Sequence, residues 1–181
     1  MLYRILISFF AIFVLSSISM AAELPATTDI DNTELTLNDS GYCQKALIKV
    51  YNHGLYLTQS SSSVAAIVAA DETQAIELVV TSRLVTAVNI RDAFDEGIRR
   101  STKNQTDAIS SEIASFSSVF ANRVEKGDQF SFTYTTEQGT TIMRNGEQQK
   151  VIEGIAFKQA LFGIWLSANS VDQKLKVKLL G

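Results

Sequence analysis

Cysteine, histidine and proline are nearly absent from this sequence of 181 residues, which holds one of each. Because Cys43 has no second cysteine to pair with, an internal disulfide is excluded even in an oxidising compartment. Cys43 and His53 are too few for a Cys/His metal site or a histidine-based catalytic triad. Glycine-rich phosphate loops and the G-x-S-x-G hydrolase pattern are also absent. We therefore expect no metal and no cofactor.

Positive charge is scarce as well. The sequence has 16 lysines and arginines against 19 acidic residues, which gives a formal net charge of −3. No basic block occurs, and this argues against nucleic acid as a partner. Hydrophobic residues make up 46% of the chain, which is enough for the core of one ordinary globular domain.

The longest apolar run, Ile5–Leu15, follows Arg4 near the N-terminus. It is short for a membrane span, which needs about 20 residues. Ser19-Met20-Ala21 then supplies the small residues that a signal peptidase reads. The pattern predicts a signal peptide over residues 1–21, and a periplasmic or secreted product with no stable membrane insertion after cleavage. An uncleaved anchor is the alternative.

The folded domain is expected at residues 33–181, after a flexible lead-in at residues 22–32. Its organising stretch is Lys45–Leu57, K-A-L-I-K-V-Y-N-H-G-L-Y-L, whose alternation predicts one long strand. The alternation changes face at Asn52-His53-Gly54, and a glycine inside a strand predicts a bulge that would restore one buried face. Asn38–Gly41 predicts a turn ahead of this strand.

The remaining elements follow two periods. Alternation predicts further strands at Thr33–Leu37, Ala75–Arg83, Phe130–Tyr134, Thr140–Met143 and Lys150–Glu153, with a hairpin turn at Asn145-Gly146. A helical period predicts helices at Val64–Ala70, Thr86–Ser101, Gln105–Ala121, Phe157–Trp165 and Val171–Leu180, the second with Thr86 as its N-cap. Strands come early and late, with helices between and after them. This order predicts an α+β fold, in which helices cover one face of a bent antiparallel sheet.

An ordered set of short motifs resembles the chalcone isomerase-like family, in the form found as small exported bacterial proteins. The motifs of the first half are L-x-x-x-G at Leu37–Gly41, K-V-Y-x-x-x-L-Y-L at Lys49–Leu57, F-x-E-G at Phe94–Gly97 and K-G-D at Lys126–Asp128. Those of the second half are G-T at Gly139–Thr140, N-G at Asn145–Gly146, I-x-G at Ile152–Gly154, F-x-x-A-L at Phe157–Leu161, I-W-L at Ile164–Leu166 and a terminal L-L-G. The resemblance implies an open-faced β-sandwich, with an apolar cleft between a long curved sheet and a helical layer.

The plant enzymes of this family close a chalcone to a flavanone by adding a phenolate oxygen to an enone. That chemistry needs a cation to hold the oxyanion and hydroxyl donors to stabilise the forming enolate. The resemblance places those positions on this chain as follows: the family's arginine at Cys43, a strand threonine at Tyr51, a helix tyrosine near Asn89 or Ile90, an asparagine at Glu96 and a second threonine at Ile164.

These substitutions count against the plant reaction. A cysteine near its reference pKa is mostly neutral at pH 7, so Cys43 cannot grip an oxyanion as a bidentate arginine does. Glu96 would repel a phenolate. The non-catalytic branches of the family use the same arginine with a tyrosine to hold a fatty-acid carboxylate, so that anchor is missing too. Arg83 or Arg91 could supply a cation from another direction, although a solvated position is the commoner use of both.

Three functional hypotheses follow. The first is an exported, non-catalytic protein that binds a small hydrophobic, lipid-like or fatty-acid-like ligand in the cleft, with Cys43, Tyr51, Asn89, Glu96 and Ile164 as candidate cleft residues. The second is an isomerase or intramolecular lyase acting on another substrate, which would need Tyr51 and one of the two arginines at one void. The third is a structural or interaction protein, which predicts a broad exposed apolar patch.

Overall fold

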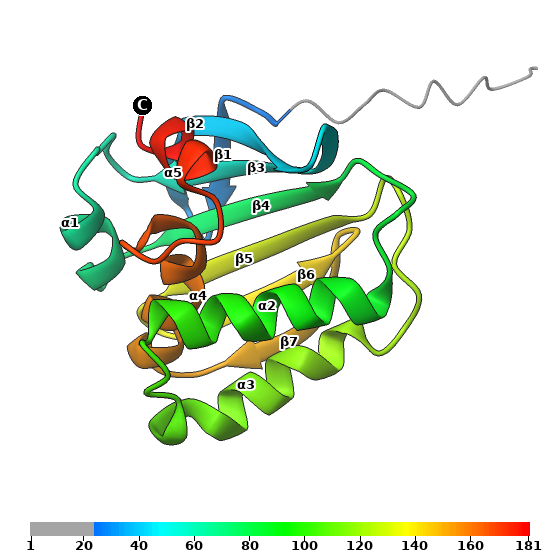
Figure 1. Cartoon of the computed structure of the whole chain (residues 1–181). Helices are drawn as coiled ribbons and strands as arrows, with labels where there is room; N and C mark the ends of the chain where they lie inside the picture. The colour runs from blue at the N-terminus through cyan, green and yellow to red at the C-terminus, as the bar shows by residue number, and fades with distance from the viewer. Residues whose placement is uncertain (1–23) are drawn as a thin grey trace, which may run out of the picture.

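The computed structural model describes residues 24–181, which form one sheet with helices packed on one of its faces (Figure 1). The strands are β1 (Thr27–Ile30), β2 (Thr33–Lys45), β3 (Ile48–Leu57), β4 (Gln74–Val80), β5 (Gln129–Thr135), β6 (Gly139–Arg144) and β7 (Glu147–Ile152). The α-helices are α1 (Val64–Ala69), α2 (Ala87–Ser101), α3 (Ser110–Ser117), α4 (Ile155–Leu166) and α5 (Gln173–Leu179). The predicted signal peptide lies outside the described residues.

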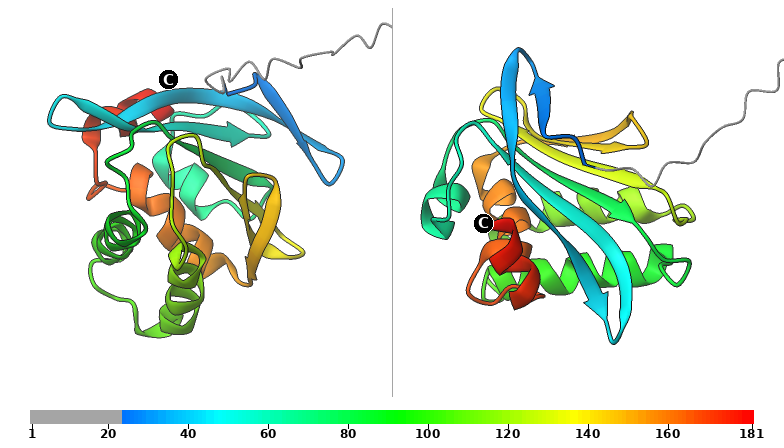
Figure 2. Two further views of the ribbon diagram at one scale, coloured as in Figure 1. Left: turned by 90° about the vertical axis from the view of Figure 1, so that its right-hand side faces the viewer. Right: turned by 90° about the horizontal axis from the view of Figure 1, so that it is seen from above.

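The sheet is an antiparallel meander in which each strand pairs with the next along the chain, from β1 to β7. Both views in Figure 2 show the helices on one side of the sheet, while the edge strands β1 and β7 curl toward the other side. The β2–β3 hairpin bends the opposite way, so that its tip lies on the helical side. The predicted α+β class, a bent antiparallel sheet covered by a helical layer, is confirmed.

The main core fills the space between the sheet and the helices. Its centre is aromatic: the Phe94 ring lies 5.0 Å from those of Phe116 and Phe120, 5.5 Å from Phe132 and 5.8 Å from Trp165. Aromatic rings bury large areas and gain further from edge-to-face and offset contacts, so this cluster ties the helical layer to the sheet. A second, smaller cluster of Leu35, Tyr56 and Ala75 is packed separately.

Helix α2 follows its sequence pattern closely. Thr86 is the N-cap and forms a reciprocal capping box with Asn89, which satisfies backbone N–H groups at the helix start. The helix packs tightly against α4, because a Cβ added at Gly97 would lie 2.7 Å from Cγ2 of Ile164. Only glycine permits this separation of the two helices.

The turn predicted at Asn38–Gly41 is wrong, because these residues lie within β2. A register shift against β3 makes Asn38 an extra residue in the ladder. Its side-chain amide then bonds elsewhere and donates to the carbonyl of Leu179 at 2.7 Å. Gly41 lets α5 approach, since a Cβ there would lie 3.0 Å from the Leu175 side chain. Residues typical of turns here form a bulge and a helix contact.

The long strand predicted at Lys45–Leu57 starts later than expected. Lys45 ends β2, Ala46 and Leu47 form the hairpin turn, and β3 begins at Ile48. Ala46 has a φ of 54°, and Leu47 is 97% exposed. Because this turn carries apolar side chains at the period of the following strand, the sequence pattern conceals it.

The bulge predicted at Asn52-His53-Gly54 lies instead at Val50, where the register of β3 against β2 shifts. From Tyr51 to Leu55 the ladder is regular, and Tyr51 and its i+2, i+4 and i+6 neighbours are all buried. A bulge therefore restores the buried face as expected, but it lies before Tyr51. Because no bulge separates the two residues, His53 shares the face of Tyr51.

The flexible lead-in predicted at residues 22–32 contains β1, which pairs with the first half of β2. The Tyr56 hydroxyl also donates to the carbonyl of Pro25 at 2.9 Å. The folded domain thus begins before residue 33.

The helix predicted at Gln105–Ala121 is divided into a 3-10 turn (Asp107–Ile109), α3 and a second 3-10 turn (Ser118–Phe120).

Candidate ligand-binding cavity

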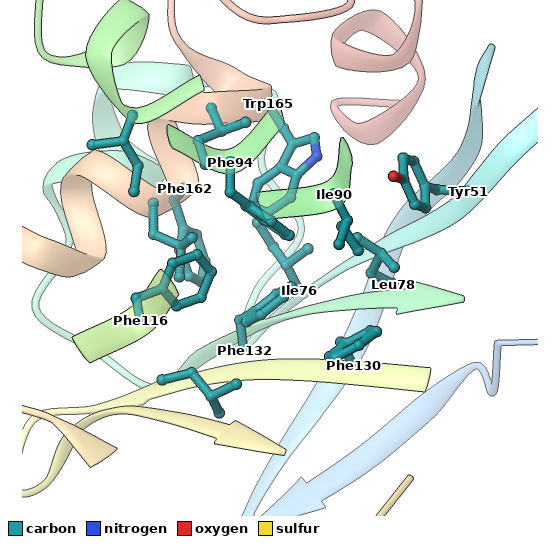
Figure 3. Packing of buried hydrophobic residues seen from close by; sticks show 14 of the residues in the cluster. Tyr51, Ile76, Leu78, Ile90, Phe94, Phe116, Phe130, Phe132, Phe162 and Trp165 are labelled. Carbon is teal, nitrogen blue, oxygen red and sulfur yellow. The ribbon is translucent and has the colours of Figure 1, made fainter. Parts of the chain in front are cut away.

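A cavity of about 140 Å³ lies between the β2–β3 hairpin, helices α2 and α4, and the start of α5. Its sheet wall consists of Cys43, Tyr51, His53 and Leu78, and its helical wall of Ile90, Ala93, Phe94 and Ile164. The other lining residues form its rim: Gln44 and Lys45 are exposed, and Val171 and Asp172 are half-buried. Figure 3 shows Tyr51 beside Ile90 and Leu78, at one end of the aromatic cluster.

A larger hollow of about 590 Å³ lies on the surface beside α5 and is lined partly by Lys49, Lys174 and Lys178. These lysines are exposed, so the hollow is a solvated groove. The smaller cavity is mainly apolar and sits between sheet and helices, as a site for an apolar ligand should. It is the candidate ligand cavity.

Three of the five candidate residues meet at this cavity. Cys43 and Tyr51 reach it from adjacent strands, where they are direct partners in the β2–β3 ladder. Ile164 reaches it from α4. Tyr51 and Ile164 are buried, and Cys43 is half-buried.

Asn89 lies outside the cavity, exposed at the start of α2. Its Oδ1 accepts from the backbone N–H of Thr86 at 2.8 Å, and its Nδ2 donates to the carbonyl of Leu84 at 2.9 Å. Both polar atoms of the side chain thus take part in capping the helix. The next residue, Ile90, lines the cavity instead, because it occupies the buried face of the helix.

Glu96 also lies outside the cavity. It is exposed, and its carboxylate pairs with Arg99 at 2.6 Å, one helical turn further on. The helix turns this position to solvent, while Ala93 and Phe94 face the cavity. Glu96 therefore neither repels nor binds a ligand there.

His53 is the cavity residue that sequence reasoning missed. It is 2% exposed, and its Nδ1 finds no hydrogen-bond partner among the described residues. Its ring lies 5.9 Å from the Tyr51 ring and 5.5 Å from Trp165. Burial lowers the pKa of His53 to about 3, so the imidazole is neutral near pH 7. The signal was available, because His53 is two residues from Tyr51 on the same strand.

The other polar groups of the sheet wall are neutral too. Burial raises the pKa of Cys43 to about 11, an effect that nearby Asp172 adds to and Lys45 opposes. Burial likewise raises the pKa of Tyr51. At pH 7 the wall thus presents a thiol, a phenol and an imidazole, all uncharged.

Within residues 24–181, no arginine takes the place of the missing family cation. Arg83 lies on a different surface hollow, next to Arg123 and Lys126. The Arg91 side chain is 41% exposed, and its Nε lies 3.9 Å from the carboxylate of Asp92. The condition set for the enzyme hypothesis, Tyr51 and an arginine at one void, is not met by the described residues.

Comparison with known proteins shows which family this chain belongs to. The sequence profile described as chalcone isomerase-like matches residues 19–181. The chain belongs to the chalcone isomerase-like family. A crystal structure of an Arabidopsis thaliana fatty-acid binding protein is similar in fold, with a TM-score of 0.69 and 16% identity over 87% of this chain and 90% of that one. No curated protein sequence matches.

Other features of this chalcone isomerase-like chain bear on the remaining hypotheses. Within residues 24–181, no helix has the length and apolar character to cross a bilayer, and no cluster of three His, Cys, Asp or Glu could hold a metal ion. Exposed apolar side chains occur on the β2–β3 hairpin, at Tyr42, Leu47 and Ile48, and near the start of α2, at Leu84 and Val88. The interaction hypothesis would apply to these two stretches.

Proposed function

We propose that this protein is a non-catalytic, exported member of the chalcone isomerase-like family that binds a small hydrophobic ligand. The observation that carries the proposal is the cavity of about 140 Å³ between sheet and helices. Its walls are apolar except for three neutral polar groups, the pattern of a binding pocket rather than of an oxyanion site.

The family relation supports binding and argues against the plant reaction. A structural relative with 16% identity is described as a fatty-acid binding protein. In this chain Cys43 takes the place of the arginine that the resemblance leads one to expect, and no other cation lies on the inner walls of the cavity. Without a cation on these walls, the charge of a bound phenolate is not compensated. Binding thus fits this cavity better than intramolecular lyase chemistry.

A retained ligand tests the proposal. The protein is purified without detergent and examined by native mass spectrometry, where a bound small hydrophobic molecule is the expected result. In Ala93→Phe an aromatic ring is added at the cavity wall, and the ligand should be lost. Ala114→Phe adds the same ring at an exposed site on α3 and should keep it. Equal, ligand-free spectra for all three proteins would overturn the proposal.

Export remains part of the proposal, on the strength of the apolar run Ile5–Leu15 and the small residues before Ala22. The mature protein should begin at Ala22 and be found in the periplasm or the medium. The intact mass of the native protein checks this. Recovery of a chain that retains Met1–Ala21 in the membrane fraction would contradict it.

A further inference from the structure

We infer that the cavity selects a small uncharged ring-sized ligand that carries a hydroxyl or a similar neutral polar group, and that His53 hydrogen-bonds to that group. The inference rests on the proposed function, since it specifies the ligand class of the same cavity. It also departs from a carboxylate ligand, because the polar group it assigns is neutral.

The first argument is that a ring nitrogen of His53 is buried without a hydrogen-bond partner. Buried polar atoms in folded proteins almost always have a partner, and one left without costs stability. Nδ1 of His53 has none among residues 24–181, and the side chain, which is almost wholly buried, lines the cavity. A hydroxyl both donates and accepts, so it can pair with the imidazole nitrogen that faces the cavity in either neutral tautomer.

The second argument is charge. The cavity's charged lining residues are Lys45, which is exposed, and Asp172, which is half-buried and carries the opposite charge. An anion placed beside His53 would lose its hydration, while the only lining cation stays exposed at the rim, and such a burial is strongly unfavourable. A cation would meet the same loss of hydration against apolar walls. The interior therefore favours a neutral molecule.

The third argument is size and shape. A cavity of about 150 Å³ lined by apolar side chains holds one benzene ring, and this cavity measures about 140 Å³. Ile90, Leu78 and Phe94 supply flat or branched apolar walls. One ring or a short branched chain fills that space, with its polar group toward His53.

Two probe pairs test the inference on the purified protein at pH 7. Phenol and toluene have the same size and differ in a hydroxyl, while benzamide and benzoate have the same shape and differ in charge. We expect toluene and phenol both to bind. In His53→Leu, the preference for phenol relative to toluene should fall about threefold to tenfold, the value of one net hydrogen bond. Cys43→Ala, which removes a different polar group from the same wall, should change that ratio less.

Benzamide should bind at least about tenfold more tightly than benzoate, because the anion is not compensated. A second measurement needs no variant. His53 is the only histidine in the chain, so its imidazole nitrogen signals are unambiguous in a ¹⁵N spectrum. Phenol should shift an imidazole nitrogen signal strongly, and toluene should shift both signals little.

The outcomes separate the two proposals. If none of the four probes enters the cavity, both the inference and the proposed function at this site fail. If toluene binds, but His53→Leu leaves the phenol-to-toluene ratio unchanged and phenol shifts neither imidazole nitrogen signal, the inference fails and the hydrophobic pocket stands. If benzoate binds better than benzamide, the inference fails because the cavity takes anions.

Discussion

Two polar side chains are buried in the same layer between sheet and helices, and they differ in how completely they are bonded. Lys158 of α4 is 0% exposed, and its Nζ donates to the carbonyls of Ile67, Val68 and Ala70 at 2.9, 3.2 and 2.8 Å. His53 of β3 is 2% exposed and leaves Nδ1 without a described partner. Every hydrogen-bond donor of Lys158 has a partner, whereas His53 can still form a hydrogen bond.

The bonding of Lys158 explains why a charge is tolerated there. Helix α1 has six residues and no basic residue in its last turn, so α4 supplies the cation that its carbonyl end favours. The ammonium has three donors and meets three acceptors, and it also lies 5.1 Å from the ring centre of Phe162. Burial still lowers the pKa of Lys158 to about 8. Nothing remains for a ligand, so Lys158 is structural.

The comparison teaches that burial of a polar group does not by itself mark a binding site. At Lys158 the protein supplies every partner, and the group holds α1 against α4. At His53 it supplies rings and apolar walls but no partner for Nδ1. The unsatisfied group is the one that a ligand can complete.

The largest expected effect on stability is at Lys158, whose hydrogen-bond donors all have partners. Lys158→Met should lower the free energy of unfolding by about 3 kcal/mol, because it leaves buried carbonyls of α1 without donors. Urea unfolding followed by the fluorescence of Trp165, the only tryptophan, measures this. Lys174→Met, at an exposed position of α5, is the matched control and should cost less than about 0.5 kcal/mol. Equal losses for the two variants would remove the distinction drawn above.

The next effect is the acid sensitivity of the His53 site. Burial holds the pKa of His53 at about 3 in the folded protein, below its ordinary value of 6.5. The unfolded chain therefore binds a proton first as the pH falls, so stability is present above pH 6.5 and is lost toward pH 3. Between pH 7 and pH 5 the loss should be about 2 kcal/mol relative to His53→Leu. Parallel pH curves for the two proteins would show that His53 titrates normally.

A third change would give the cavity the charge that it lacks. Cys43→Arg restores the cation expected from the family, at a half-buried position near Asp172. Its stem can lie along apolar walls while the guanidinium reaches the rim, so we expect a loss of about 1–2 kcal/mol. Benzoate should then bind. A loss above roughly 4 kcal/mol without anion binding would mean that Cys43 packs in a closed core.

The smallest effect is expected at Glu96, which the family resemblance places in the cleft and the fold turns to solvent. Glu96→Gln removes an exposed ion pair with Arg99 and should change stability by less than about 0.5 kcal/mol. Phenol affinity should not change. A clear change in phenol binding would show that α2 can rotate this position toward the cavity.

The sequence by itself predicted the fold class, the family and most elements. Alternation and the helical period are local, and they state which face of each segment is apolar. Thr86 and the stripe of Ile90, Phe94 and Ile98 thus predicted α2 and its start correctly. The ordered family motifs likewise predicted the family that the profile match then showed.

Only the tertiary structure decided what those faces meet. The bulge lies at Val50 and not at His53, so His53 stays on the face of Tyr51, and the hairpin turn at Ala46 was hidden by apolar neighbours. In the sequence, Lys158 is a single charge within an apolar helix. Only the fold brings its ammonium to the carbonyl of Ile67, 91 residues away in the chain. Register and long-range hydrogen bonds depend on partners that no local period encodes, so the chemistry of both buried groups was set by the folded chain.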